Sequence, residues 1–315
     1  MLYRIIKFFA RVALHFYCRK LVINNKILLD SKGPLLIAAN HPNSFLDAII
    51  IDTLFKQPVT ALTRGDVFKN KFFRKILFSL NMLPVYRVSE GAENLEHNYT
   101  TFEACNTIFK QGGIVLIFSE GRCINEWHLR PLKKGTSRLA LSAWQQGIPL
   151  KVLPLGINYN SFKTFGKTLH LNFGQLIDIK NIPEPLSSGL ASVCFNKLLH
   201  HELSKVVYEL PKEDTKSIAQ LFSQQLTPFK KIFLFIPAVV GYFIHFPLYF
   251  LAKSIVRKRP NDHYDSIIVG FLFFAYPMCL LIIAIIAYLN FGLLNTLLIL
   301  LLLPFTAWAL IQLKN

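Results

Sequence analysis

The side chains best suited to acid–base chemistry in this sequence are His41 and Asp47, which flank the segment 42–46. A neutral imidazole can take a proton from a substrate hydroxyl, and a carboxylate on its other ring nitrogen fixes the tautomer and stabilises the imidazolium. Residues six positions apart do not share a face of one helix, so a loop must fold back to bring this pair together. Spacing alone leaves a second interpretation open, in which Asp47 only caps a helix and His41 is a loop histidine.

Charged residues also follow the ends of two other apolar runs, 83–86 and 114–118. An arginine placed directly after a strand can bind a phosphate through two parallel hydrogen bonds, and lysines near a helix N-terminus favour anions. An isolated charge of this kind is usually a solvated surface residue, and that alternative stays open for each of them. The candidate binding residues are Arg87, Glu120, Gly121, Arg122, Lys133 and Lys134.

The elements that must position His41 and Asp47 are a strand and the helix that follows it. The run 35–39 has the length and apolar content of a buried strand, and the polar residues 40–43 end it. Ser44 followed three residues later by Asp47 has the form of a capping box, with Ser44 as the N-cap. His41 is therefore expected on a loop after a strand end, where open α/β sheets bind ligands.

Residues 21–230 alternate between strand and helix patterns, which favours an α/β fold with a central mixed sheet covered by helices. The further strands are expected at 59–63, 83–86, 114–118, 150–159 and 167–173, and the further helices at 71–80, 93–111, 135–146 and 191–210. Segment 211–216 is the best linker candidate. Helix 71–80 is expected to turn its apolar residues inward, namely Phe72, Phe73, Ile76, Leu77 and Leu80.

Both ends of the chain have patterns that bind membranes. Residues 1–20 predict a basic amphipathic helix suited to a membrane interface, although an ordinary packing helix has the same pattern. Hydrophobic residues make up 52% of the sequence, and their excess is concentrated after residue 231. Segment 232–252 is apolar but interrupted by Pro237, Gly241 and Pro247. Segments 266–289 and 291–313 are expected to form an antiparallel helical hairpin that turns at Asn290.

The formal net charge of +17 favours a polyanionic partner, either nucleic acid or an anionic membrane surface. The membrane is the better interpretation because the chain has spanning segments and no nucleic-acid-binding motif, so a membrane lipid is expected as partner and nucleic acid is not. The five cysteines form no CxxC pair and indicate reduced thiols facing the cytoplasm.

Basic clusters on both sides of segment 232–252 predict its orientation. Cytoplasmic loops are enriched in Lys and Arg, and here Lys230 and Lys231 precede the segment while Lys253, Arg257, Lys258 and Arg259 follow it. Because a straight span would put one cluster on the wrong side, the segment is expected to bend at its prolines and glycine or to lie shallow in the interface. We therefore expect an integral membrane protein, in the inner or plasma membrane if bacterial, with residues 21–230, both termini and the loop 253–265 on the cytoplasmic side.

Four motifs together resemble the glycerolipid acyltransferase family, which includes 1-acylglycerol-3-phosphate and glycerol-3-phosphate acyltransferases. Asn40-His41 with Asp47 is similar to the first block of that family, and segment 83–87 (LPVYR) to the second. Segment 118–122 (FSEGR) is similar to the third block, and 148–154 to the fourth. The resemblance covers about residues 30–165 and keeps the order and approximate spacing of the family.

Two features depart from the family pattern. Five residues separate His41 from Asp47 where the family usually has four, a longer gap also shown by a subset resembling fungal glycerol-3-phosphate acyltransferases. Arg122 follows Gly121 directly, where the family usually has a threonine between them. The second departure bears on the role of Arg122 more than on that of Glu120.

The resemblance implies that residues 21–230 are a catalytic domain, between an interfacial helix at 1–20 and a C-terminal membrane region at 231–315. This domain would move a fatty acyl group from the thioester of acyl-CoA or acyl carrier protein to a hydroxyl of lysophosphatidic acid or glycerol 3-phosphate. His41 would be the general base and Asp47 would orient it, with no cofactor or metal. Arg87, helped by Arg122, Lys133 and Lys134, would hold the acceptor's phosphate, and Glu120 would organise that site.

Two other classes of function stay open. One is a lipid hydrolase with a nucleophilic Ser44, Ser119 or Cys123, although neither serine lies in a GxSxG elbow. The other is a non-catalytic membrane protein that binds lipid, against which the His–Asp pair argues. The sequence does not specify the acceptor, the acyl length, the donor carrier or the oligomeric state.

Overall fold

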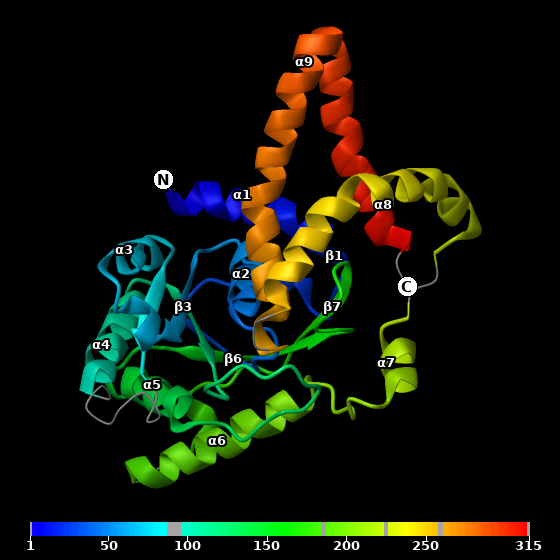
Figure 1. Ribbon diagram of the computed structural model, residues 1–315. Helices are drawn as coiled ribbons and strands as arrows, with labels where there is room; N and C mark the ends of the chain where they lie inside the picture. Colours follow the sequence, from blue (N-terminus) through cyan, green and yellow to red (C-terminus); the bar gives the residue numbers. More distant parts are fainter. Residues whose placement is uncertain (1, 87–95, 184–186, 224–225, 258–260, 314–315) are drawn as a thin grey trace. The chain divides into compact units, whose positions relative to one another are not determined.

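The computed structural model describes residues 2–86, 96–183, 187–223, 226–257 and 261–313 (Figure 1). Its strands are β1 (Cys18–Ile23), β2 (Leu35–Ala39), β3 (Val59–Arg64), β4 (Met82–Val85), β5 (Ile114–Phe118), β6 (Lys151–Tyr159) and β7 (Lys167–Phe173). Its α-helices are α1 (Leu2–Tyr17), α2 (Phe45–Leu54), α3 (Lys71–Ser79), α4 (His97–Lys110), α5 (Lys134–Gln145), α6 (Ser188–Ser204), α7 (Thr215–Leu221), α8 (Pro228–Val256) and α9 (Tyr264–Leu313).

The strands form one seven-stranded sheet in the order β1-β7-β6-β2-β5-β3-β4. Strand β2 is parallel to both of its neighbours, with Leu35 opposite Ile114 of β5 and opposite Lys151 of β6. Strand β3 is parallel to β5 and β4. The carboxyl ends of β2, β3, β5 and β6 therefore share one edge, and the predicted α/β fold is confirmed.

Strand β2 is buried on both faces because helices cover both sides of the sheet (Figure 1). Leu36 and Ala38 belong to a core cluster that includes Phe109 of α4, Leu139 of α5 and Phe195 of α6. Since side chains alternate along a strand, Leu35, Ile37 and Ala39 point to the opposite face, where they are also buried. This double burial explains why β2 is a continuous apolar run.

Helices α1, α6 and α7 depart from the predicted elements. Helix α1 ends at Tyr17 rather than residue 20, because Cys18 begins strand β1. Helix α6 ends at Ser204 rather than residue 210, because the side chain of Asn158 accepts from the N–H of Tyr208 at 2.8 Å and donates to the carbonyl of Val206 at 2.9 Å. Helix α7 was not predicted, since seven residues carry little periodic signal.

The predicted inward face of α3 is wrong. Phe72 and Phe73 are 68% and 57% exposed, and Ile76, Leu77 and Leu80 are only half-buried. Apolar residues at helical spacing indicate an amphipathic helix but do not say what covers the apolar face.

The described residues form two compact units. The first contains Met1–Phe9, Val22–Asn158 and His170–Asp214, and the second contains Ala10–Leu21, Tyr159–Leu169 and Thr215–Asn315. The division into an interfacial helix at 1–20, a catalytic domain at 21–230 and a membrane region at 231–315 stays a prediction.

Two helices of the second unit, α8 and α9, are long and apolar enough to cross a membrane. Helix α8 includes both Pro237 and Pro247 and follows a curved path (Figure 1). Helix α9 folds back on itself at Gly292, whose φ of 75° and ψ of 176° are nearly restricted to glycine. The predicted hairpin is therefore present, but it turns at Gly292 rather than at Asn290, which is still helical.

Candidate active site

The loop after β2 carries His41 at the carboxyl edge of the sheet, as predicted. Asn40 fixes the start of this loop, because its side chain donates to the carbonyl of Ile157 at 3.1 Å and accepts from the N–H of Ile157 at 2.7 Å. Asn125 holds the next residue by donating to the carbonyl of Pro42 at 2.6 Å. The loop is thus tied to β6 on one side and to the segment after β5 on the other.

His41 and Asp47 are brought together by this loop. The Nδ1 atom of His41 lies 2.9 Å from Oδ2 of Asp47, and the carboxylate of Asp47 is fully buried. The backbone N–H of Asn43 donates to the same Oδ2 at 2.8 Å. A buried carboxylate with two such partners orients the imidazole and leaves Nε2 as the ring nitrogen for a substrate.

The predicted capping box is wrong, because the side chain of Ser44 does not accept a hydrogen bond from the first turn of α2. Ser44 stands at the N-cap of α2, but its side chain makes no capping hydrogen bond and its φ is 54°. Its backbone N–H donates instead to Sγ of Cys123 at 2.8 Å. The carboxylate of Asp47 pairs with His41 and Asn43, and its backbone N–H donates to the carbonyl of Ser44 at 3.2 Å.

The ring of His41 is also held from its face and from its backbone. It stacks on the ring of Phe118, the last residue of β5, with centroids 3.8 Å apart and planes 12° apart. The backbone N–H of His41 donates to Oε2 of Glu120 at 3.0 Å. The side chain of His41 keeps 17% of its surface exposed, so the ring is positioned but accessible.

Glu120 is a buried carboxylate whose main partner is Arg130, a residue that the sequence did not single out. Oε1 of Glu120 accepts from the backbone N–H of Arg130 at 3.0 Å, and Oε2 accepts from its guanidinium at 3.1 Å. The same guanidinium lies 3.3 Å from Glu126 and donates to the carbonyl of Arg122. A buried carboxylate needs a cation or several hydrogen-bond donors. The position of Glu120 after a buried strand was therefore the sequence signal for a cationic partner such as Arg130.

Four more of the predicted binding residues follow Glu120 in the segment that leads into α5. Gly121 has a φ of 74°, and a Cβ on it would lie 3.0 Å from Cγ of Lys133, so its backbone requires glycine. Lys133 precedes α5 and donates its backbone N–H to the carbonyl of Ser119 at 2.8 Å. Arg122, Lys133 and Lys134 are exposed. Arg87 lies outside the described residues.

All five cysteines are free thiols. Burial raises the pKa of Cys105 to about 12, so this thiol is not a nucleophile at neutral pH. Burial also raises the pKa of Cys18 to about 12, although the nearby Lys167 acts in the opposite direction. Cys123 is half-buried and uses its sulfur to accept from Ser44.

The segment that contains the candidate active site matches a known protein family. Residues 20–158 match the family model described as Acyltransferase, a span that includes all four motif blocks. No curated protein matches the sequence. A solved structure, the 1-acyl-sn-glycerophosphate (LPA) acyltransferase PlsC from Thermotoga maritima, is 15% identical with a TM-score of 0.46, covering 71% of this chain and 81% of that one.

Proposed function

We propose, because residues 20–158 match the Acyltransferase family model, that the chain acylates a phosphorylated glycerolipid acceptor, lysophosphatidic acid or glycerol 3-phosphate. The donor would be a fatty acyl thioester, carried by CoA or acyl carrier protein. The observation that carries the proposal is the His41–Asp47 pair, 2.9 Å apart, with its carboxylate buried and its imidazole at the carboxyl edge of the sheet.

In the proposed reaction, Nε2 of His41 takes the proton of the acceptor hydroxyl as that oxygen attacks the thioester carbonyl carbon. Asp47, on the other ring nitrogen, stabilises the imidazolium that forms. The tetrahedral intermediate then expels the thiolate, which takes the proton from the imidazolium. The ester bond replaces the thioester bond, and His41 returns to its neutral form without an acyl-enzyme.

The acceptor's phosphate would be held by cations beside this pair. Arg122, Lys133 and Lys134 are exposed around Gly121, and Arg87 follows β4 in the sequence. Glu120 would organise this region through Arg130 and the backbone of His41, because a carboxylate repels phosphate and its oxygens are already engaged.

Product analysis tests the proposal. The full chain in lipid nanodiscs would be offered acyl-CoA or acyl carrier protein thioester together with lysophosphatidic acid, glycerol 3-phosphate or an unphosphorylated lysolipid. We expect mass spectrometry to find an ester of a phosphorylated acceptor in an amount equal to the thiol released. Release of free fatty acid in place of that ester would identify a hydrolase, and failure to consume any thioester would identify a non-catalytic lipid-binding protein.

We further propose that the catalytic domain and the loop between α8 and α9 face the cytoplasm. The support is the pair of basic clusters around α8 and the curved path of that helix. We expect a membrane-impermeant thiol reagent, applied to intact cells, to label Asn290→Cys near the hairpin turn and not Asn261→Cys. The variants would be made in a chain without reactive native cysteines, and lysed cells would serve as the control. Labelling of Asn261→Cys in intact cells would contradict this topology.

A further inference from the structure

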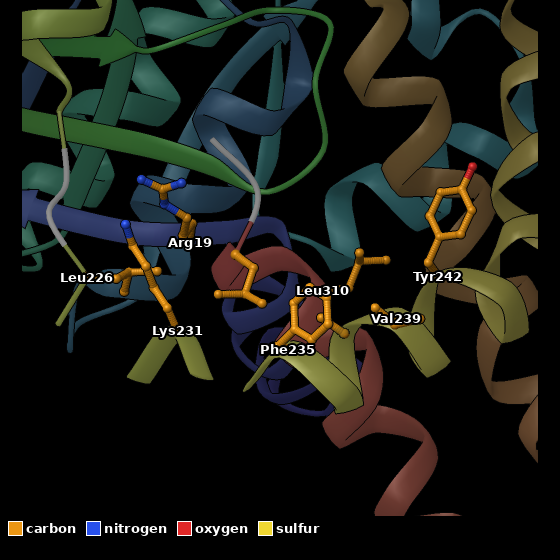
Figure 2. Close-up of a pocket in the computed structure, with 9 residues that line it drawn as sticks. Arg19, Leu226, Lys231, Phe235, Val239, Tyr242 and Leu310 are labelled. Carbon is orange, nitrogen blue, oxygen red and sulfur yellow. The ribbon is translucent and has the colours of Figure 1, made fainter. Parts of the chain in front are cut away.

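The second unit contains a cavity of about 500 Å³ that the proposed reaction does not use (Figure 2). The first half of α8, the last turn of α9, one residue of β1 and Leu226, which precedes α8, form its walls. A cavity of this size lies in the range that binds small molecules. Its lining residues are Arg19, Leu226, Lys231, Phe235, Ala238, Val239, Tyr242, Leu310 and Leu313.

One end of the cavity is cationic. Figure 2 shows the guanidinium of Arg19 and the ammonium of Lys231 together at that end, and none of the lining residues is acidic. Arg19 is half-buried and Lys231 is exposed. Burial lowers the pKa of Arg19, and an anionic ligand would favour its charged form.

The rest of the cavity is apolar and follows one face of α8. Phe235, Ala238, Val239 and Tyr242 continue from Lys231 at helical spacing, so they lie along the same side of the helix. Tyr242 is at the end of the cavity away from the two cations (Figure 2). The two helices meet closely beyond this face, because a Cβ on Gly241 would lie 2.3 Å from the carbonyl oxygen of Thr306. The cavity is therefore charged at one end and apolar along its length.

We propose that this cavity binds one anionic phospholipid of the surrounding bilayer, with its phosphate between Arg19 and Lys231 and an acyl chain along α8. A soluble anion would gain nothing from the apolar wall, and a zwitterionic lipid would match the two cations less well. Helices α8 and α9 are long and apolar enough to place the cavity beside lipid. The proposal is independent of the proposed reaction, since no lining residue belongs to the site around His41.

Lipid retention by the full chain tests this assignment. The purified protein would be equilibrated in detergent with equal amounts of phosphatidylglycerol and phosphatidylcholine, and native mass spectrometry would count the lipids that stay bound. We expect wild-type protein to retain one phosphatidylglycerol in preference to phosphatidylcholine. We expect the double variant Arg19→Gln/Lys231→Gln to lose that preference by at least about tenfold, because each cation contributes a charge-assisted hydrogen bond.

Two further variants make the result specific. Lys253→Gln removes a cation from the other end of α8 that does not line the cavity, so its preference should equal that of the wild type. Val239→Trp keeps both cations but fills the apolar wall, so it should also reduce retention. Circular dichroism would verify that each variant is folded. Equal retention of both lipids by the wild type, or unchanged retention in both the double variant and Val239→Trp, would overturn the proposal.

Discussion

His41 has the position and the partners that a general base requires, so its removal should affect chemistry rather than folding. We expect His41→Ala to lower kcat by about 10²–10⁴-fold, the usual contribution of a general base. Asp47→Asn should also lower kcat, because a neutral amide does not stabilise the imidazolium. Steady-state rates of thioester consumption would measure both effects.

The chain supplies a matched control for this prediction. His128 and Glu209 form another histidine–carboxylate pair, with Nδ1 2.6 Å from Oε2, but both side chains are at least half exposed. His128→Ala should leave kcat unchanged. Near-wild-type turnover by His41→Ala, or equal losses in the two variants, would rule out His41 as the base.

Arg130 compensates the buried charge of Glu120. We therefore expect removal of Arg130 to destabilise the protein more than removal of the charge on Glu120. Arg130→Met should destabilise the protein by about 3–5 kcal/mol, because it leaves a carboxylate buried without its cation. Glu120→Gln should cost less, since the amide oxygen still accepts from the backbone of His41. The double variant should recover much of the stability lost in Arg130→Met. Thermal unfolding in detergent would compare the three, and a double variant that is less stable than Arg130→Met would contradict the argument.

At this scale the sequence predicted that His41 and Asp47 lie together, but not the contacts that support them. His41 and Asp47 were identified because their types and a short loop limit where they can lie. Arg130 was missed because the path of the segment between β5 and α5 decides which cation reaches Glu120. The stacking of His41 on Phe118 depends on the pairing of β2 with β5, which one strand's pattern does not specify.

Among the elements, strands buried on both faces were the easiest to predict. Residues 35–39 and 114–118 were predicted with the bounds that the structure shows, because apolar runs between polar or glycine residues have clear ends. Residues 167–173 alternate polar and apolar side chains, and their bounds were predicted because Gly166 and Gly174 flank them. Strand β1 was missed because its sequence continues the basic and apolar pattern of α1. It forms a strand because it pairs with β7 in the sheet, and the local sequence does not predict such a long-range pairing.

Helix α3 exposes aromatic side chains among cations, and we expect this face to contact the membrane. Phe72 and Phe73 are 68% and 57% exposed, and the cations around them are Lys69, Lys71, Arg74 and Lys75. Aromatic rings in the interface and cations near anionic headgroups both favour such a contact. The helix follows β3, whose carboxyl end is at the same sheet edge as His41, so the contact would bring that edge to the lipid.

An environment-sensitive fluorophore on Phe72→Cys, in full-length protein reconstituted into anionic vesicles, would report this contact. We expect a blue-shifted emission that lipid-attached quenchers reduce. The control is Tyr99→Cys on α4, which replaces an aromatic side chain that is 77% exposed on another helix. The same emission and quenching at both positions would show that α3 has no special relation to the bilayer.

At the scale of the whole molecule, a buried ion pair connects strand β7 to the start of α9. Nζ of Lys167 lies 2.6 Å from Oδ2 of Asp265, with side-chain exposures of 0% and 3%. The hydroxyl of Tyr17 also donates to Asp265, at 3.3 Å. The sequence did not predict this pair, because its members are far apart in the chain and belong to segments that were assigned to different domains.

Breaking the pair should therefore destabilise the protein strongly. Asp265→Ala leaves Lys167 as a buried charge and should cost about 3–5 kcal/mol. The double variant Lys167→Met/Asp265→Leu removes both charges and should be closer to the wild type. Thermal unfolding of the full chain in detergent would measure both, with the exposed pair Lys56–Asp30 as a control in which Asp30→Ala costs little. A small loss in Asp265→Ala would contradict this prediction.

The same ion pair should also affect the order in which the parts of the protein fold during synthesis. Lys167 leaves the ribosome well before Asp265, because the whole of α8 lies between them in the chain. Until Asp265 is available, burying the lysine costs several kcal/mol, so the first residues of β7 stay solvated. We therefore expect the sheet to be completed only when the segment that follows α8 is available, so that a nascent chain arrested before residue 265 carries an incomplete sheet at its β7 end.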